Sequence, residues 1–219
     1  MSRLHVAVLS DREADGGANI AGYRITEALA AAGHRITTIY EQSREDPRWE
    51  SRRLPSGLAT HRWSRPARIA STLLPSGVRL DRHHRVTADA LAAVLDDARP
   101  DAVLVHNMHI ASWSPELLGV ASRYAPVVCT LHDTWTFTGR CAYPGSCVQF
   151  RSGCTATCPT AGEYPALAPA RIAAAWRLRR DLLRDTPNIA AVSPSRWLAE
   201  LALSGLWQSR PVFAIPYAV

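Results

Sequence analysis

The side chains with the greatest chemical potential are four cysteines crowded into one stretch late in the chain. They follow the pattern Cys-x5-Cys-x6-Cys-x3-Cys-Pro and account for four of the five cysteines in 219 residues: Cys141, Cys147, Cys154 and Cys158. Four thiolates at this spacing match the ligands of a structural zinc ion, which would cross-link the Gly- and Pro-containing loop 139–160. Two disulfides, an iron–sulfur cluster and free thiols are the alternatives that the spacing leaves open. The fifth cysteine, Cys129, lies in an apolar run and is expected in the core.

A second group of polar residues directly follows three apolar runs. Imidazole and carboxylate groups in such positions can hydrogen-bond sugar hydroxyls or transfer protons. The group contains His106, Asn107 and His109 after one run, His132 and Asp133 after the next, and Arg196 shortly after the third. We expect these side chains to share one rim if the runs are neighbouring strands of a sheet.

A pair of glycines follows the first apolar run. Gly16 and Gly17 would let backbone N–H groups approach a ligand at the start of a helix, where the helix dipole favours a phosphate. The spacing from Gly17 to Gly22 is not the dinucleotide fingerprint, which requires G-x-G-x-x-G. A tight strand–helix connection is the simpler explanation of the same pair.

The elements that would position these residues alternate regularly between strand and helix. Strands are expected at 4–9, 35–40, 102–105, 127–131, 189–192 and 212–215, and helices at 18–32, 86–98, 115–124, 169–184 and 195–204. This order predicts an α/β fold with a doubly wound, mostly parallel, Rossmann-like sheet that binds ligands at the carboxyl ends of its strands. We expect one domain over 1–219, interrupted by an irregular segment at 41–85 with a short strand near 61–63 and one short helix.

Composition and charge narrow the function classes. A content of 47% hydrophobic and 20% charged residues excludes a disordered chain, no apolar run is long enough to cross a membrane, and no signal peptide is apparent. The net charge of +6 comes entirely from 44–85, which holds ten Arg against four acidic residues. This stretch could face an anionic acceptor, a phosphate or a membrane surface, or be an ordinary solvated segment. Nucleic acid is a poor candidate, because Trp49 and Trp63 form no aromatic platform.

Several of these motifs together resemble the GT-B fold glycosyltransferases of family 4. They are Gly16-Gly17-Ala18-Asn19-Ile20-Ala21, His106-Asn107-Met108-His109 and Ser193-Pro194-Ser195-Arg196-Trp197-Leu198. The most specific stretch, His132-Asp133-Thr134-Trp135-Thr136-Phe137-Thr138-Gly139-Arg140-Cys141 with Cys158-Pro159, is similar to a branch found among capsule and exopolysaccharide transferases that carries the same four-Cys loop.

The resemblance implies a two-domain enzyme that moves a sugar from a nucleotide-sugar to a sugar or polyol acceptor with retention of configuration and without a catalytic metal. The present chain would be the N-terminal, acceptor-side domain. By position, Gly16 and Gly17 would contact the donor diphosphate, and His132, supported by Asp133, would lie beside the reacting sugar. The resemblance places His106, Asn107 and His109 on the acceptor side, with Arg196 as a further phosphate or acceptor contact.

The chain departs from the family at its end, where Pro216-Tyr217-Ala218 stands in place of a common Pro-Asn-Gly. The donor-binding C-terminal domain is then missing, and we expect the isolated chain to be inactive, because half of the positioning groups would be absent. Because no signal peptide is apparent, we expect a cytoplasmic protein, and the basic stretch 44–85 could place it peripherally at the inner membrane face. Two alternatives are a nicotinamide-dependent Rossmann oxidoreductase, with Glu41 in the place of a ribose-binding acid, and a non-catalytic zinc-stapled binding module.

Overall fold

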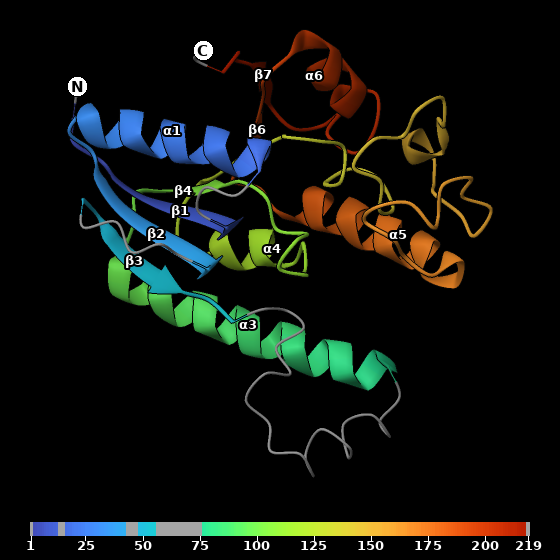
Figure 1. Ribbon diagram of the computed structural model, residues 1–219, viewed down its shortest axis with the longest axis horizontal. Coiled ribbons are helices and arrows are strands. Elements are labelled where there is room, and N and C mark those ends of the chain that lie inside the picture. The colour runs from blue at the N-terminus through green and yellow to red at the C-terminus, as the bar shows by residue number, and fades with distance from the viewer. Residues whose placement is uncertain (1, 13–15, 43–47, 56–75, 218–219) are drawn as a thin grey trace.

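The protein is a layered α/β structure built on one parallel sheet. The computed structural model describes residues 2–12, 16–42, 48–55 and 76–217, and only the backbone of 42 and 76–83. Seven parallel strands lie in the order β3-β2-β1-β4-β5-β6-β7 (Figure 1). The strands are β1 (His5–Arg12), β2 (Arg35–Gln42), β3 (Glu50–Arg53), β4 (Ala102–Val105), β5 (Val127–Thr130), β6 (Ile189–Ser193) and β7 (Val212–Ala214). The doubly wound, Rossmann-like sheet expected from the sequence is confirmed.

Helices cover both faces of this sheet. They are α1 (Gly17–Ala31), α3 (Ser76–Ala98), α4 (Leu117–Ala121), α5 (Pro169–Asp185) and α6 (Arg196–Leu203), with one short 3-10 helix η1 (Gln149–Arg151). Figure 1 shows α1 on one side of the sheet and α3 and α4 on the other. Helix α6 lies on the side of α3, because its Leu198 and Ala202 pack into the same core cluster as Leu91. A strand between two helical layers needs apolar side chains on both faces, and Val6–Leu9 in the middle of β1 are all apolar and buried.

The apolar core is divided by the sheet. The smaller cluster lies under α1 and contains Val6, Val8, Ile36 and Trp49. The larger cluster includes Leu91 and Leu95, which are four residues apart on α3 and therefore on one helix face. Cys129 is fully buried in β5 within this larger cluster, as expected, and burial raises its pKa to about 12.

Helix ends follow local chemistry. The Ser195 side chain accepts a hydrogen bond from Leu198 N and caps α6. Gly33 ends the α1 turn with a positive φ of 89°, a conformation that costs glycine little. Arg210 donates to the carbonyl oxygens of Leu183 and Arg184, which are left without helical partners at the end of α5.

The segment 41–85 is more ordered than the sequence predicted, and this expectation was wrong at both of its ends. Strand β2 continues to Gln42, β3 forms at Glu50–Arg53, and α3 begins at Ser76 rather than Val86. The start of this helix could not be predicted, because 76–85 is rich in Arg and His and has too few apolar residues to show the hydrophobic periodicity of a helix. The short strand expected at 61–63 lies outside the described residues. Within the described part of the chain, no helix is long and apolar enough to span a membrane.

Candidate functional site

The site lies where the order of the strands reverses, between β1 and β4. Here Asp11 lies near the end of β1. Its carboxylate accepts a hydrogen bond from Ile110 N at 3.0 Å, and its backbone N donates to Asn107 O at 2.8 Å. These two bonds fix the loop that follows β4 against the end of β1. Crevices at such reversal points are the usual ligand sites of doubly wound sheets.

Two histidines from neighbouring strand ends meet in this crevice. His106 follows β4 and His132 follows β5, and these strands are paired in the sheet. His106 Nδ1 and His132 Nε2 are 2.9 Å apart, so one proton is shared between the two rings. The sequence-based expectation that both residues reach one rim is confirmed.

Both imidazoles are neutral at physiological pH. Burial lowers the pKa of His106 to about 3 and that of His132 to about 4, and Asp133 only partly opposes the second shift. A neutral ring donates one hydrogen bond and accepts another but carries no charge. Among the described residues, buried His106 Nε2 has no hydrogen-bond partner.

Tyr217 completes the contacts of His132. Its hydroxyl forms a short hydrogen bond with His132 Nδ1, and burial raises the pKa of this phenol to about 12. Both nitrogens of His132 therefore face protein atoms. A substrate hydroxyl can reach Nδ1 only after Tyr217 has withdrawn from it.

A second chain of polar groups runs through His109. His109 Nε2 donates to the Asp133 carboxylate at 2.9 Å, which leaves Nδ1 to accept from the Tyr164 hydroxyl at 2.9 Å. The other Asp133 oxygen accepts from Trp135 N at 2.8 Å. The expectation that Asp133 supports His132 is therefore corrected, because the carboxylate is hydrogen-bonded to His109 and acts on His132 only through its charge.

Helix α1 closes over the buried member of the first pair. A Cβ added to Gly22 would lie 3.0 Å from His106 Cγ, closer than side chains normally approach. Glycine at this position therefore lets α1 approach the ring of His106. It brings the beginning of the helix, with Gly16 and Gly17, to the same end of the sheet as the histidines.

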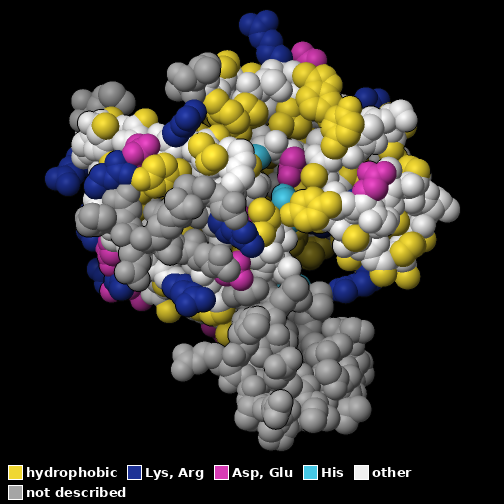
Figure 2. Space-filling model, in the orientation of Figure 1, with side chains coloured by type: hydrophobic (Ala, Val, Ile, Leu, Met, Phe, Trp, Pro, Cys, Tyr) yellow, Lys and Arg dark blue, Asp and Glu magenta, His cyan; other side chains and the backbone are white. Residues whose placement is uncertain are grey.

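The remaining predicted site residues have no described side-chain bond to the histidines. Gly16 precedes α1 with a positive φ of 87°, and space around Gly16 and Gly17 is open to a ligand. Asn107 is half-buried in the β4 loop, whereas Arg196 is exposed at the start of α6. The structure shows no contact of Arg196 with either histidine chain among the described residues. Figure 2 shows histidine and acidic side chains reaching the surface together near the middle of one face.

A groove of about 510 Å³ opens beside His109. Its walls include Trp113, Trp135, Arg140, Arg171 and Arg179. The Arg179 guanidinium lies 4.2 Å from the centre of the Trp135 ring and donates from Nε to Trp135 O. Burial lowers the pKa of Arg179 to about 10, so this residue is still cationic at neutral pH. The groove therefore offers aromatic faces and positive charge next to a histidine.

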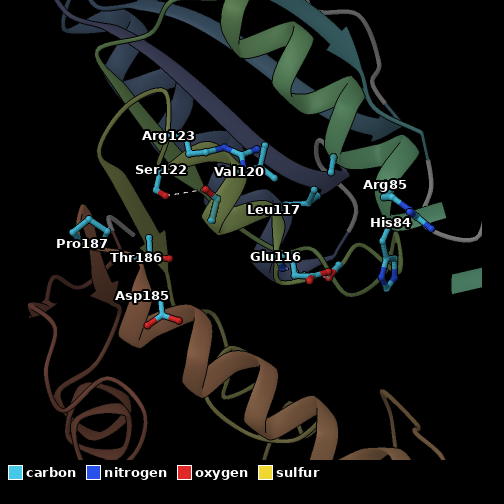
Figure 3. A pocket seen from close by; sticks show the side chains of 13 residues that line it. His84, Arg85, Glu116, Leu117, Val120, Ser122, Arg123, Asp185, Thr186 and Pro187 are labelled. Atoms are coloured by element: carbon cyan, nitrogen blue, oxygen red, sulfur yellow. Dashed lines mark hydrogen bonds between the residues drawn. The ribbon is translucent and has the colours of Figure 1, made fainter. Parts of the chain in front are cut away.

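A larger pocket of about 820 Å³ runs along α4, between α3 and the end of α5 (Figure 3). Arg123, Asp185 and Pro187 on its rim lie just before β5 and β6, at the opposite end of these strands from the histidines. None of the residues predicted to form the site lines it. We therefore place the chemistry in the histidine crevice and its adjoining groove.

The arginines of the basic segment that the structure describes are mostly engaged. Arg48 forms an ion pair with Glu27 at 2.6 Å and lies over the Trp49 ring, while Arg52 pairs with Asp97 at 2.9 Å. Trp49 itself is buried against Tyr23. Residues 56–75 lie outside the described residues. The expectation that 44–85 faces an anionic partner or membrane surface therefore stays a prediction.

Comparison with known proteins decides the family. Residues 15–196 match the model of Glycosyltransferase Family 4. The chain belongs to glycosyltransferase family 4. Among curated proteins, the putative colanic acid biosynthesis glycosyl transferase WcaC of Escherichia coli K12 is 38% identical over 79 residues, which are 34% of this chain and 18% of WcaC.

A solved structure agrees with this family-4 assignment in fold. Sucrose-phosphate synthase from Thermosynechococcus elongatus superposes with a TM-score of 0.57 at 15% sequence identity. The match covers 98% of this chain and 48% of the synthase, so the present chain spans about half the length of that protein. The family-4 chain thus has the Rossmann-like α/β fold of the GT-B enzymes.

Sequence reasoning missed several residues of this family-4 site. Asp11 directly follows the first apolar run, and its place at a strand end could have singled it out. Tyr164 lies in an irregular loop and Tyr217 in the segment after β7. Neither segment has a hydrophobic periodicity from which the direction of the tyrosine side chain could be predicted. Gly22 lies within a helix, where a glycine needs a packing reason, and that signal was available.

Proposed function

We propose that this chain is the acceptor-side domain of a retaining glycosyltransferase that moves a sugar from a nucleotide-sugar to a hydroxyl of a glycan or small-molecule acceptor. Membership of family 4 gives the class of reaction. The observation that carries the proposal is the pair of polar chains that converge after β4 and β5, one through His106 and His132 and the other through His109 and Asp133. A donor subsite and an acceptor subsite can share a boundary there.

In the proposed reaction the bond between the anomeric carbon and the diphosphate oxygen breaks. The acceptor oxygen then bonds to the anomeric carbon on the same face, and its proton passes to the departing phosphate. This route needs no carboxylate nucleophile. Asp133 suits another role, because its two oxygens already accept from His109 and Trp135.

The leaving diphosphate needs stabilisation, and the start of α1 can supply it. The first backbone N–H groups of a helix have no helical partners and point toward the positive end of the helix dipole. Gly16 and Gly17 present these groups without side chains in the way. We assign the donor diphosphate to this turn.

Neutral His132 suits contact with the sugar itself. A cationic ring would repel the positive charge that develops at the anomeric carbon, whereas a neutral ring can hydrogen-bond a sugar hydroxyl without that penalty. The low pKa of His132, about 4, keeps it in this form. We assign the role beside the reacting sugar to His132.

The acceptor then occupies the groove next to His109. There the Tyr164 hydroxyl donates to His109 Nδ1, so its oxygen can still accept from an acceptor hydroxyl. Trp135 provides an apolar face for a sugar ring. We assign His106 and Asn107, which follow β4 together with His109, to the acceptor side as well.

We further propose that a donor-binding domain in the complete enzyme closes over this face, and that the isolated chain is inactive without it. The experiment is to express the chain with its natural downstream sequence and to measure nucleotide-sugar turnover. For His132→Ala we expect kcat to fall by about 10²–10³-fold, the scale of losing one well-placed transition-state hydrogen bond.

A matched control is His34→Ala, since His34 follows α1 at the opposite end of the sheet and bonds only Leu4 N among the contacts of its ring. It should keep full turnover. Unchanged kcat in His132→Ala would remove His132 from the mechanism, and no turnover with any nucleotide-sugar in the unmodified enzyme would overturn the proposed reaction.

A further inference from the structure

The four clustered cysteines share neighbours in a way that their spacing alone does not reveal. All are free thiols, and the loop that carries them holds only the short η1 helix. Thr160 Oγ1 lies 3.8 Å from Cys141 Sγ and 3.7 Å from Cys158 Sγ, and Arg140 Nη1 lies 3.7 and 4.0 Å from the same two sulfurs. Gly139 N, two residues before Cys141, lies 3.2 Å from Cys154 Sγ. Three of the four sulfurs therefore lie around the segment 139–141.

Two buried arginines flank this cluster without a carboxylate bonded to either. Arg140 is 2% exposed and Arg179 is 4% exposed. Arg140 is held by carbonyl oxygens of Thr160, Glu163 and Pro165, which satisfy its hydrogen bonds but do not neutralise it. The described ion pairs include neither residue, and Arg179 lines the same groove as Gly139 and Arg140.

Buried cations without counter-ions are costly, so the surrounding chemistry should supply negative charge. The Asp133 carboxylate is close enough for its charge to act on Arg179, but its hydrogen bond is made to His109. Free thiols are neutral, and so are two disulfides. A zinc ion bound by four thiolates carries a net charge of −2, which balances two guanidinium groups.

We propose that Cys141, Cys147, Cys154 and Cys158 bind one zinc ion, and that Arg140 and Arg179 balance the charge of this tetrathiolate centre. Gly139 N already donates to Cys154 Sγ at 3.2 Å, the kind of N–H···S bond that steadies a thiolate ligand. Among the described side chains, no three stand close enough to hold an ion as they are. Binding therefore requires the thiols to rotate inward. Cys147 lies outside the helices and strands and is only partly buried.

The centre would act on the site through Arg140. The carbonyl oxygens that Arg140 binds come from both sides of Tyr164, whose hydroxyl meets His109. Arg179 likewise holds the carbonyl of Trp135. Zinc would then fix two walls of the groove, as a structural rather than a catalytic ion.

The test is metal analysis of the purified 219-residue chain, produced with zinc and without chelators, and it is independent of the proposed sugar transfer. We expect about one zinc per chain, and a cobalt-substituted form with the thiolate-to-metal charge-transfer absorption of a tetrahedral site. Cys147→Ser should lose the metal, Cys147→His should retain it because histidine is also a zinc ligand, and Cys129→Ala should retain it as the control.

The role of the arginines has its own readout. Arg179→Met should weaken zinc affinity about tenfold in chelator competition, while Arg179→Lys, which keeps the charge, should weaken it less. A metal-free protein whose four loop cysteines all resist alkylation until reduced would overturn the proposal in favour of disulfides. Iron with visible absorption would overturn it in favour of a cluster, and a metal-free protein with four freely alkylated thiols would overturn it outright.

Discussion

His106 Nδ1 lies 2.9 Å from His132 Nε2, and this contact joins the ends of two adjacent parallel strands. Each ring is neutral because burial opposes its charge. Gly22 lets α1 pack closely against the His106 ring, and Tyr217 bonds the ring of His132, so each histidine has a neighbour from another element. The predictions below test each of these restraints.

Gly22→Ala should damage the pair without touching either histidine directly. Alanine normally favours a helix over glycine, but here its Cβ would lie 3.0 Å from His106 Cγ and force the ring or α1 to move. We expect a loss of about 1–3 kcal/mol in the free energy of unfolding, measured in urea, and lower turnover in the complete enzyme. Gly162→Ala, where a Cβ meets open space, is the control and should change neither. Equal stability of Gly22→Ala and wild type would contradict the close packing.

Asp133→Asn should uncouple the second polar chain. The amide no longer favours a proton on His109 Nε2, so Nδ1 loses its preference for accepting from Tyr164. We expect kcat/KM for the acceptor to fall by up to about tenfold, the scale of one lost hydrogen bond, with a changed tautomer in the nitrogen NMR spectrum of His109. Asp101→Asn is the control, since Asp101 bonds His5 N at the other end of the sheet. An unaltered His109 tautomer would refute the assigned direction of the hydrogen bond.

Stability should fall in mild acid. The unfolded chain protonates its histidines near pH 6.5, whereas His106 and His132 in the folded state do so only near 3 and 4. Unfolding therefore takes up protons in this window, and each group removes up to about 1.4 kcal/mol per pH unit as the pH falls from about 6.5 toward 4. Asp11 acts in the opposite sense, because burial raises its pKa and the folded protein binds that proton first.

Urea unfolding at several pH values measures this slope. His106→Gln removes one of the two groups and should flatten the acid limb, while His34→Gln should leave it as steep as in wild type. The burial argument fails if both variants follow the wild-type slope.

Tyr217→Phe should free His132 for substrate. The variant keeps the ring but removes the hydroxyl that occupies His132 Nδ1. Since one neutral hydrogen bond contributes about 0.5–1.5 kcal/mol, we expect donor nucleotide-sugar to bind the complete enzyme up to about tenfold more tightly by calorimetry. Tyr143→Phe, at a residue that is 65% exposed and stacked near Trp197, is the control. Weaker binding in Tyr217→Phe would mean that the hydroxyl contacts the donor instead of competing with it.

The sequence was sufficient for the framework and for the two histidines at the centre of the main site. Apolar runs such as Ala102–Val105 mark buried parallel strands, and the order of those strands brings His106 and His132 to one rim. Strand order does not determine which polar groups pair within the rim. Asp133 turned to His109 rather than to its neighbour His132, because that choice depends on loop geometry.

The rest was hidden for physical reasons. Tyr164 and Tyr217 lie in segments without hydrophobic periodicity, so nothing in the sequence gives their direction. The beginning of α3 was missed because charged residues dominate its first turns. Zinc at the cysteine loop, the retaining mechanism and the anionic surface of 44–85 stay predictions.

The loop between Cys158 and α5 contacts His109 through Tyr164, and Arg140 binds carbonyl oxygens on both sides of that residue. The imidazoles of His106 and His132, in contrast, directly follow strands of the sheet. The histidine pair is thus held by the sheet, whereas the loop beside it is held by separate contacts and can vary in sequence independently. A combinatorial library confined to 161–168 would offer a way to retarget the enzyme to new alcohols while leaving its chemistry intact.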